Sequence, residues 1–240
     1  MNAWLSILQF LSWQDYVGIV VFWACWFGYT WYAERGPASK HGLPGVMFEY
    51  RLQWSRQDPS RDIPVTSASL VANLTNSVSF YASTTIYIIA GLLALVGAVE
   101  KISSFAAELP FAQQASKELL ELKLLLLLIV FITAYFKFTW SLRQFNFLCI
   151  LIGGVPHERN LTDPERSEKF AQRMARVNAN AGDEFNRGLR AYYYGIAAMA
   201  WFIQPWLFIA MTVGVTAVLY RRDFHSPTLK IVRDEFPPTI

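Results

Sequence analysis

The sequence predicts an all-α integral membrane protein, a helical bundle with four main transmembrane helices and short amphipathic helices on the cytoplasmic side. Four long runs without charge, one of them interrupted by a single lysine, each reach the ~18 residues that signal a membrane-spanning helix. The composition is 54% hydrophobic and 16% aromatic over 240 residues, which is too apolar for an ordinary soluble surface. Polar loops separate the runs and keep the average hydropathy modest.

The four spans are expected at about residues 15–33, 67–99, 122–152 and 190–220, in a single membrane-embedded domain with a polar tail at 221–240. The second uncharged run would be ~50 Å long as a helix, so it must tilt, kink or begin outside the lipid. Pro205 predicts a kink in the fourth span.

Basic residues in the loops set the expected orientation, because Lys and Arg are retained on the cytoplasmic side. The loops at 34–64 and 157–190 hold twelve of them, against seven on the other side. Both loops should therefore be cytoplasmic and both termini outside, although Arg221 and Arg222 argue the other way. Asp163 followed by Pro164 predicts the start of an amphipathic helix in the third loop.

No catalytic constellation is recognisable. Cys25 and Cys149 each stand alone, and His41, His157 and His225 lie in three separate polar segments. Motifs for metal binding, phosphate binding or a serine nucleophile are absent from the sequence. The sequence therefore predicts no enzyme, no metal and no cofactor, and its dispersed net charge of +3 predicts no nucleic-acid partner.

The second span carries a polar stripe. Eight residues fall within about 60° of one line on a helical wheel. Such a stripe either joins helices through hydrogen bonds or lines a wet pathway, and the sequence leaves both readings open. Its members are Ser69, Asn73, Asn76, Phe80, Ser83, Thr84, Tyr87 and Gly91.

Lys137 belongs to a polar face of the third span. If the membrane boundary lies near Arg143, the lysine can snorkel to the interface; if the helix continues through 145–155, the lysine is deep. None of the four uncharged runs contains a carboxylate, so the expectation is an unpaired cation that favours anions, or an amine deprotonated by burial. The other members of this face are Thr133, Trp140, Ser141 and Gln144.

Several segments resemble the bacterial and plant membrane-protein family called domain of unknown function 599. The resemblance covers roughly Tyr16 to Tyr220 and implies a multi-pass protein of the bacterial inner membrane, without supplying an activity or catalytic residues. It adds the motif residues Arg143, Asn146, Arg187 and Arg190 as further candidates. The segments are ASTTI (82–86), KFTWSLRQFNF (137–147), FNRGLRAYYY (185–194) and AWFIQPW (200–206).

The expected function is an oligomeric channel or transporter for a small anion or other polar solute. Four spans leave little room for a pore in one subunit, so the lipid bilayer and further copies of the chain are the expected partners. The alternative is a structural or assembly subunit of a membrane complex. An intramembrane enzyme is not favoured, because the sequence has no recognisable nucleophile, base or metal motif. The candidate pathway residues are Lys137, Asn73, Asn76, Ser83, Thr84, Tyr87, Thr133, Ser141 and Gln144.

Overall fold

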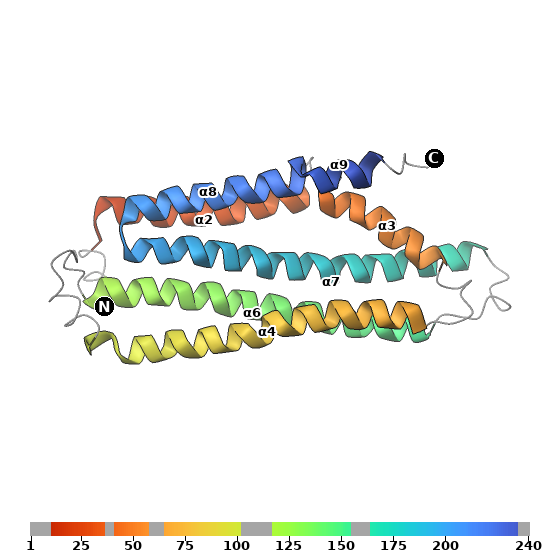
Figure 1. The fold of residues 1–240 in the computed structure, drawn as a ribbon, viewed down its shortest axis with the longest axis horizontal. Coiled ribbons are helices and arrows are strands. Elements are labelled where there is room, and N and C mark those ends of the chain that lie inside the picture. Colours follow the sequence, from red (N-terminus) through yellow and green to blue (C-terminus); the bar gives the residue numbers. More distant parts are fainter. Residues whose placement is uncertain (1–10, 37–40, 58–64, 102–116, 155–163, 235–240) are drawn as a thin grey trace. The chain divides into compact units, whose positions relative to one another are not determined.

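The computed structural model describes residues 11–36, 41–57, 65–101, 117–154 and 164–234 (Figure 1). These residues form seven α-helices and no strand, which confirms the predicted helical class. The helices are α2 (Trp13–Arg35), α3 (Leu43–Gln57), α4 (Val65–Gly97), α6 (Lys117–Gly153), α7 (Pro164–Met199), α8 (Pro205–His225) and α9 (Pro227–Asp234).

Among the described helices, two are long and apolar enough to cross a membrane, α4 from Thr66 to Gly97 and α6. Length and composition alone do not separate such a helix from the core helix of a soluble protein. α6 runs without a break past Arg143 to Gly153. The stretch predicted as either a continuation or a re-entrant segment is therefore a continuation as far as Gly153.

The apolar run at 190–220 is not one helix, contrary to the expected fourth span. α7 starts at Pro164, as the sequence predicted, and ends at Met199. A short 3-10 turn, Ala200–Phe202, follows before α8 begins at Pro205. Proline lacks the amide hydrogen of a helix interior but fits a first turn, so Pro205 starts a new helix instead of kinking an old one.

α8 returns along α7. The Tyr194 and Thr216 hydroxyl oxygens lie 2.9 Å apart, which joins the last turns of α7 to the middle of α8. The chain between the two helices is thus a tight reversal, and the number of helical segments in this part of the chain is two where one was expected.

The chain divides into two compact units, each of which draws residues from α2, α4, α6, α7 and α8. The first contains Met1–Thr30, Thr84–Tyr135 and Leu189–Leu219; the second contains Trp31–Ser83, Phe136–Gly188 and Tyr220–Ile240.

Aromatic side chains form the core of the first unit. Phe22, Tyr194, Trp201 and Phe208 are almost completely buried. The ring of Phe22 lies 5.7 Å from that of Tyr194 and 5.4 Å from that of Phe208, measured between centroids, and Trp201 stacks on Phe208 at 5.2 Å. Because each buried ring removes a large apolar area from solvent, this cluster ties α2 to α7 and α8.

Asp15 links the start of α2 to the α7–α8 reversal. Its carboxylate accepts hydrogen bonds from the backbone and hydroxyl of Ser12, at 2.9 and 2.6 Å, and so caps α2. Its other oxygen accepts a 2.7 Å hydrogen bond from Trp201 Nε1. The Lys123 ammonium lies 5.5 Å from the centre of the Trp201 ring, so three helices meet at this buried polar point.

α3 is the connecting helix of the second unit, held by polar contacts to three other helices. The contacts are Tyr50 Oη to the Val232 carbonyl of α9 at 2.8 Å, Trp54 Nε1 to Ser67 Oγ of α4 at 3.2 Å, and Arg56 to both carboxylate oxygens of Glu168 of α7 at 2.9 and 2.8 Å.

α3 and α9 are in contact, although the expected orientation separates them. α3 lies in the first loop and α9 in the tail, so the two segments cannot be on opposite sides of a bilayer while Tyr50 bonds Val232. This contact therefore disagrees with the expectation that the tail lies opposite the first loop. Its cause is the reversal at Pro205, which adds a helix and brings the tail back; that tail is helical as far as Asp234.

Replacing Trp201 by Phe should destabilise the first unit, because it removes the donor to the buried Asp15 carboxylate. A hydrogen bond to a charged group contributes about 1.5–3 kcal/mol, and the thermal midpoint of the detergent-purified protein should fall accordingly. Trp31→Phe, at a tryptophan that is 60% exposed, is the matched control. Equal midpoints for the two variants would contradict this role of the Trp201 bond.

The Arg56–Glu168 link should depend on pH. The hydrogen bond from Arg56, assisted by one from Gln172, lowers the pKa of Glu168 from 4.5 to about 2. The link therefore stabilises the fold above about pH 4.5 and is lost as pH falls towards 2. Because both side chains are partly exposed, its contribution is at most about 1 kcal/mol.

The measurement is the unfolding free energy of the wild type and of Glu168→Gln at about pH 7 and about pH 3. The difference in unfolding free energy between the wild type and Glu168→Gln should be smaller at the lower pH. The other carboxylates affect both proteins equally and do not change this difference. A gap of the same size at both pH values would show that the link does not act through the Glu168 charge.

Candidate functional site: a charged cluster and an exposed polar stripe

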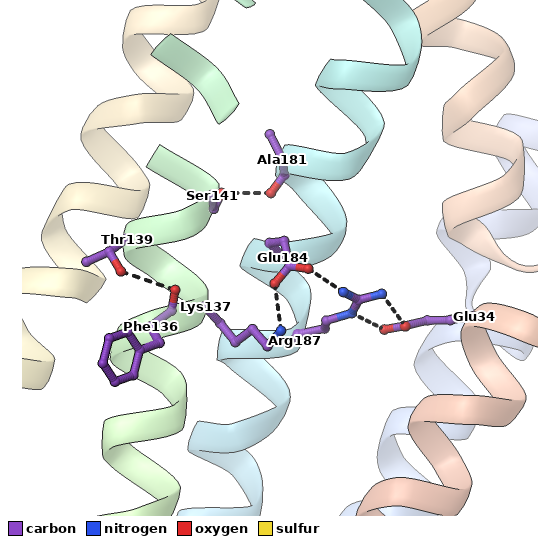
Figure 2. A network of polar contacts seen from close by, with 8 residues as sticks. All are labelled: Glu34, Phe136, Lys137, Thr139, Ser141, Ala181, Glu184 and Arg187. Atoms are coloured by element: carbon purple, nitrogen blue, oxygen red, sulfur yellow. Dashed lines mark hydrogen bonds and ion pairs between the residues drawn. The ribbon is translucent and has the colours of Figure 1, made fainter. Parts of the chain in front are cut away.

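Four charged side chains from three helices form one cluster in the second unit (Figure 2). Lys137 Nζ of α6 lies 3.0 Å from Glu184 Oε2 of α7. Arg187, one turn further along α7, contacts the other Glu184 oxygen through Nη1. It also donates to both oxygens of Glu34 of α2, at 2.8 and 2.5 Å. Two cations and two anions therefore alternate, and the cluster has no net charge.

The cluster overturns the expectation that Lys137 is unpaired. The Lys137 side chain is 36% exposed and that of Glu184 only 10%, so Glu184 is the most buried member. A carboxylate this buried requires cationic partners, and it has two. With its charge neutralised, Lys137 no longer supplies the positive potential from which a preference for anions was expected.

Close packing of α6 on α7 holds the cluster in place. Gly188 lies against the Phe138 ring so tightly that a Cβ atom there would clash with it. One turn beyond Lys137, the buried Ser141 hydroxyl donates a 2.7 Å hydrogen bond to the Ala181 carbonyl. The absence of a side chain at Gly188 thus lets the two helices approach, and the approach brings Lys137 within reach of Glu184.

The other predicted members of the α6 polar face differ in their surroundings, and Trp140 is 49% exposed. Gln144, like Ser141, is buried. The hydroxyl of Thr133 donates to the Ile129 carbonyl of the same helix at 2.8 Å. The polar face that the sequence predicted on the third span therefore contributes to helix packing at Lys137 and Ser141.

The polar stripe of α4 has the opposite placement. Its buried face holds Val71, Val78 and Leu92 together with the fully buried Ser67 and Thr85, while the stripe lies on the exposed side. Tyr87 is 77% exposed. Of the other candidates on this helix, Asn73, Asn76 and Ser83 are exposed and Thr84 is half-buried. The structure thus leaves the α4 candidates on the surface of the chain, separate from the Lys137 cluster.

The four motif residues have different surroundings. Arg143 and Asn146 are exposed on α6. Arg187 belongs to the cluster, whereas Arg190 is only 3% exposed, with its guanidinium 5.4 Å from the centre of the Tyr29 ring. Of all the candidates, the structure therefore brings together Lys137 and Arg187.

Sequence reasoning missed Glu34 and Glu184. The search for a partner of Lys137 was confined to the uncharged runs, and residues 157–190 were treated as a loop outside them. α7 is one helix across that boundary. The spacing of Glu184 and Arg187, three residues apart and just before an apolar run, places both on one helix face and was the signal available.

The chemistry of the cluster is charge pairing. Both carboxylates are engaged by cations, and the described residues contain no group of three His, Cys, Asp or Glu side chains that could hold a metal ion. The cluster neutralises its own charges and ties α2, α6 and α7 together.

A double-mutant cycle on Lys137 and Glu184 should show this coupling. Glu184→Gln should cost about 2 kcal/mol of unfolding free energy, because it removes the partner of two cations at a mostly buried position. Lys137→Met should cost about 1 kcal/mol, because the lysine is partly exposed and Arg187 still pairs Glu184. The double variant should lose less than the sum. Strict additivity would mean that the pair does not interact in solution.

The exposed pair of Lys169 and Glu165 on α7, at 2.5 Å, is the control for this cycle. Lys169→Met should change the free energy of unfolding by under about 0.5 kcal/mol.

Comparison with known proteins places the chain in a family. A family model described as "Protein of unknown function, DUF599" matches residues 17–228, a range that includes every candidate residue named above. No curated protein and no solved structure matches the chain. With most of its length matched by that model, the chain belongs to the DUF599 family.

Proposed function

We propose that the protein is embedded in the bacterial inner membrane and crosses it five times, through α2, α4, α6, α7 and α8. The support is the number of large apolar side chains that are exposed on all five helices, more than a water-facing surface carries. In a membrane such side chains are in contact with lipid chains, which are also apolar. Examples are Val20 (66%), Ile86 (50%), Phe136 (65%), Ile196 (46%) and Val218 (63%).

Five crossings also fit the distribution of basic residues better than the expected four. An odd number puts the tail on the same side as the first and third loops, in agreement with the contact between Tyr50 and Val232. The tail's four basic residues then join the twelve of those loops. Three remain on the opposite side, Lys101, Lys117 and Lys123, a larger asymmetry of the kind that orients membrane proteins.

Within this membrane, we propose that several copies form a channel or transporter for a small polar solute, with α4 lining the path. The observation that carries the proposal is the outward direction of the α4 stripe. Amides and hydroxyls facing lipid would lose their hydrogen bonds to water, so Asn73 and Asn76 favour a wet path or another protein. A path lined by α4 then lies between copies of the chain, arranged in a closed ring.

The solute should be uncharged. α4 carries no ionisable carboxylate, lysine or arginine between Thr66 and Gly97, and the Lys137 charge is neutralised by Glu184. Rings of charged side chains are what give ion channels their charge selectivity. A path lined by amides, hydroxyls and the exposed Tyr87 instead favours a neutral solute with hydrogen-bonding groups.

A structural or assembly subunit is the second candidate function. The observation in its favour is the same exposed stripe, because amides and small residues also join helices of different proteins. In that case the stripe would be covered by another membrane protein, and no solute would cross.

Flux through reconstituted liposomes tests the proposal. The wild type should accelerate the entry of glycerol or urea, followed by light scattering. Replacing both Asn73 and Asn76 by Leu should return the rate to near that of protein-free vesicles, because a hydrophobic constriction dewets. Asn146→Leu, which removes an exposed amide outside the stripe, is the matched control, and Lys137→Met should leave the flux unchanged.

Wild-type vesicles that contain intact oligomers but transport no faster than protein-free vesicles would refute the channel and leave the structural subunit. Equal loss of flux in the double variant and in Asn146→Leu would refute the assignment of the path to α4.

A further inference from the structure

One exposed cation on α6 stands in the middle of an apolar surface. Arg143 shares an arc of about 80° on the helix with four large apolar residues, all of them exposed. These are Phe136 (65%), Trp140 (49%), Phe147 (43%) and Ile150 (70%). Two of them precede Arg143 and two follow it, so large apolar side chains flank the guanidinium along the helix on both sides.

No carboxylate of the described residues pairs with Arg143; its recorded contact is with the Phe147 ring, whose centre lies 5.8 Å from the guanidinium carbon. A second copy packed on the same surface would not supply an acid either. α4 has none, and those of α6, Glu118 and Glu121, lie more than 20 residues away near the start of that helix. The described residues therefore leave Arg143 open to an anion from outside them.

The position of Arg143 along α6 identifies that source. Lys123 and Arg143 are separated by 20 residues of one continuous helix, or ~30 Å at 1.5 Å per residue. This is the thickness of the hydrocarbon core of a bilayer. If Lys123 lies at one boundary of that core, Arg143 lies at the other, at the level of the phospholipid phosphates.

We propose that Arg143, flanked by Trp140 and Phe147, binds the phosphate group of an anionic membrane phospholipid. The guanidinium offers a planar pair of donors that matches phosphate. The Phe147 ring stabilises the cation, and Trp140 is the residue type that settles at the headgroup boundary. The inference rests on the membrane location proposed above and is independent of any transport.

Native mass spectrometry of the detergent-purified full chain tests the site, with phosphatidylglycerol as the probe. Wild type should retain the lipid, and Arg143→Gln should bind it about tenfold more weakly, the factor that corresponds to ~1.4 kcal/mol. Arg143→Lys should fall between the two, because it keeps the charge and loses the paired donors. Arg173→Gln, at an exposed arginine on the polar side of α7, is the matched control and should bind like wild type.

Two further measurements distinguish a phospholipid from free phosphate as the ligand. Diacylglycerol, which has the same chains and no phosphate, should bind wild type and Arg143→Gln equally. Excess inorganic phosphate should not displace the phospholipid; complete displacement would mean a site for free phosphate and would overturn the proposal, as would equal retention of phosphatidylglycerol by wild type and Arg143→Gln.

Membrane location is measured separately, by recovery of each variant in carbonate-washed membranes. Loss of the wild type from that fraction would refute the proposed membrane protein itself. Equal lipid retention by wild type and Arg143→Gln, with both recovered in the membranes, would refute the lipid site alone.

Discussion

The position of the Glu184 carboxylate between two cations is the constraint on which the second unit depends. A carboxylate that is 10% exposed needs partners on more than one side, and it obtains them only if α7 is a single helix lying against α6. Gly188 allows that approach, and Arg187 extends the pairing to Glu34 of α2. The charge that looked like an anomaly in α6 is therefore half of a neutral pair that orders three helices.

Local signals predicted much of this fold. Asp163 and Pro164 marked the start of α7, because a capping residue and a proline at the first turn have few other uses. The wheel of the second span also gathered its polar residues on one side of α4, where Asn73, Asn76 and Ser83 are exposed. Both inferences needed only the geometry of one helix, and the structure confirms the start of α7.

The predictions that failed depended on contacts between helices. Pro205 is compatible with a kink or with a new helix, and the choice is made by Tyr194 and Thr216 meeting across the reversal. Glu184, the partner of Lys137, lies in a segment that was predicted to be a loop. The prediction searched for uncharged runs, and α7 carries many charged residues before its apolar end. The contact of the tail with α3 was missed because the helix after Pro205 was not expected.

Polar residues at helical spacing in apolar runs have two different fates in this chain. On α6 they turn towards α7 and are used within the molecule, as at Ser141. On α4 they turn away from the chain. The sequence pattern is the same in both helices. Only the position of the neighbouring helices shows whether a polar residue makes a contact inside the chain or remains exposed for a contact with another molecule.

The hydrogen bond between Tyr50 and Val232 joins residues 182 positions apart, and this separation sets an order of events during synthesis. α3 is therefore synthesised well before α9. Until α9 has been made, α3 lacks one of its three polar contacts, so the second unit cannot complete its packing before that point. A nascent chain that stalls before α9 thus leaves α3 without its contact to Val232, and such incompletely packed segments are open to proteolysis.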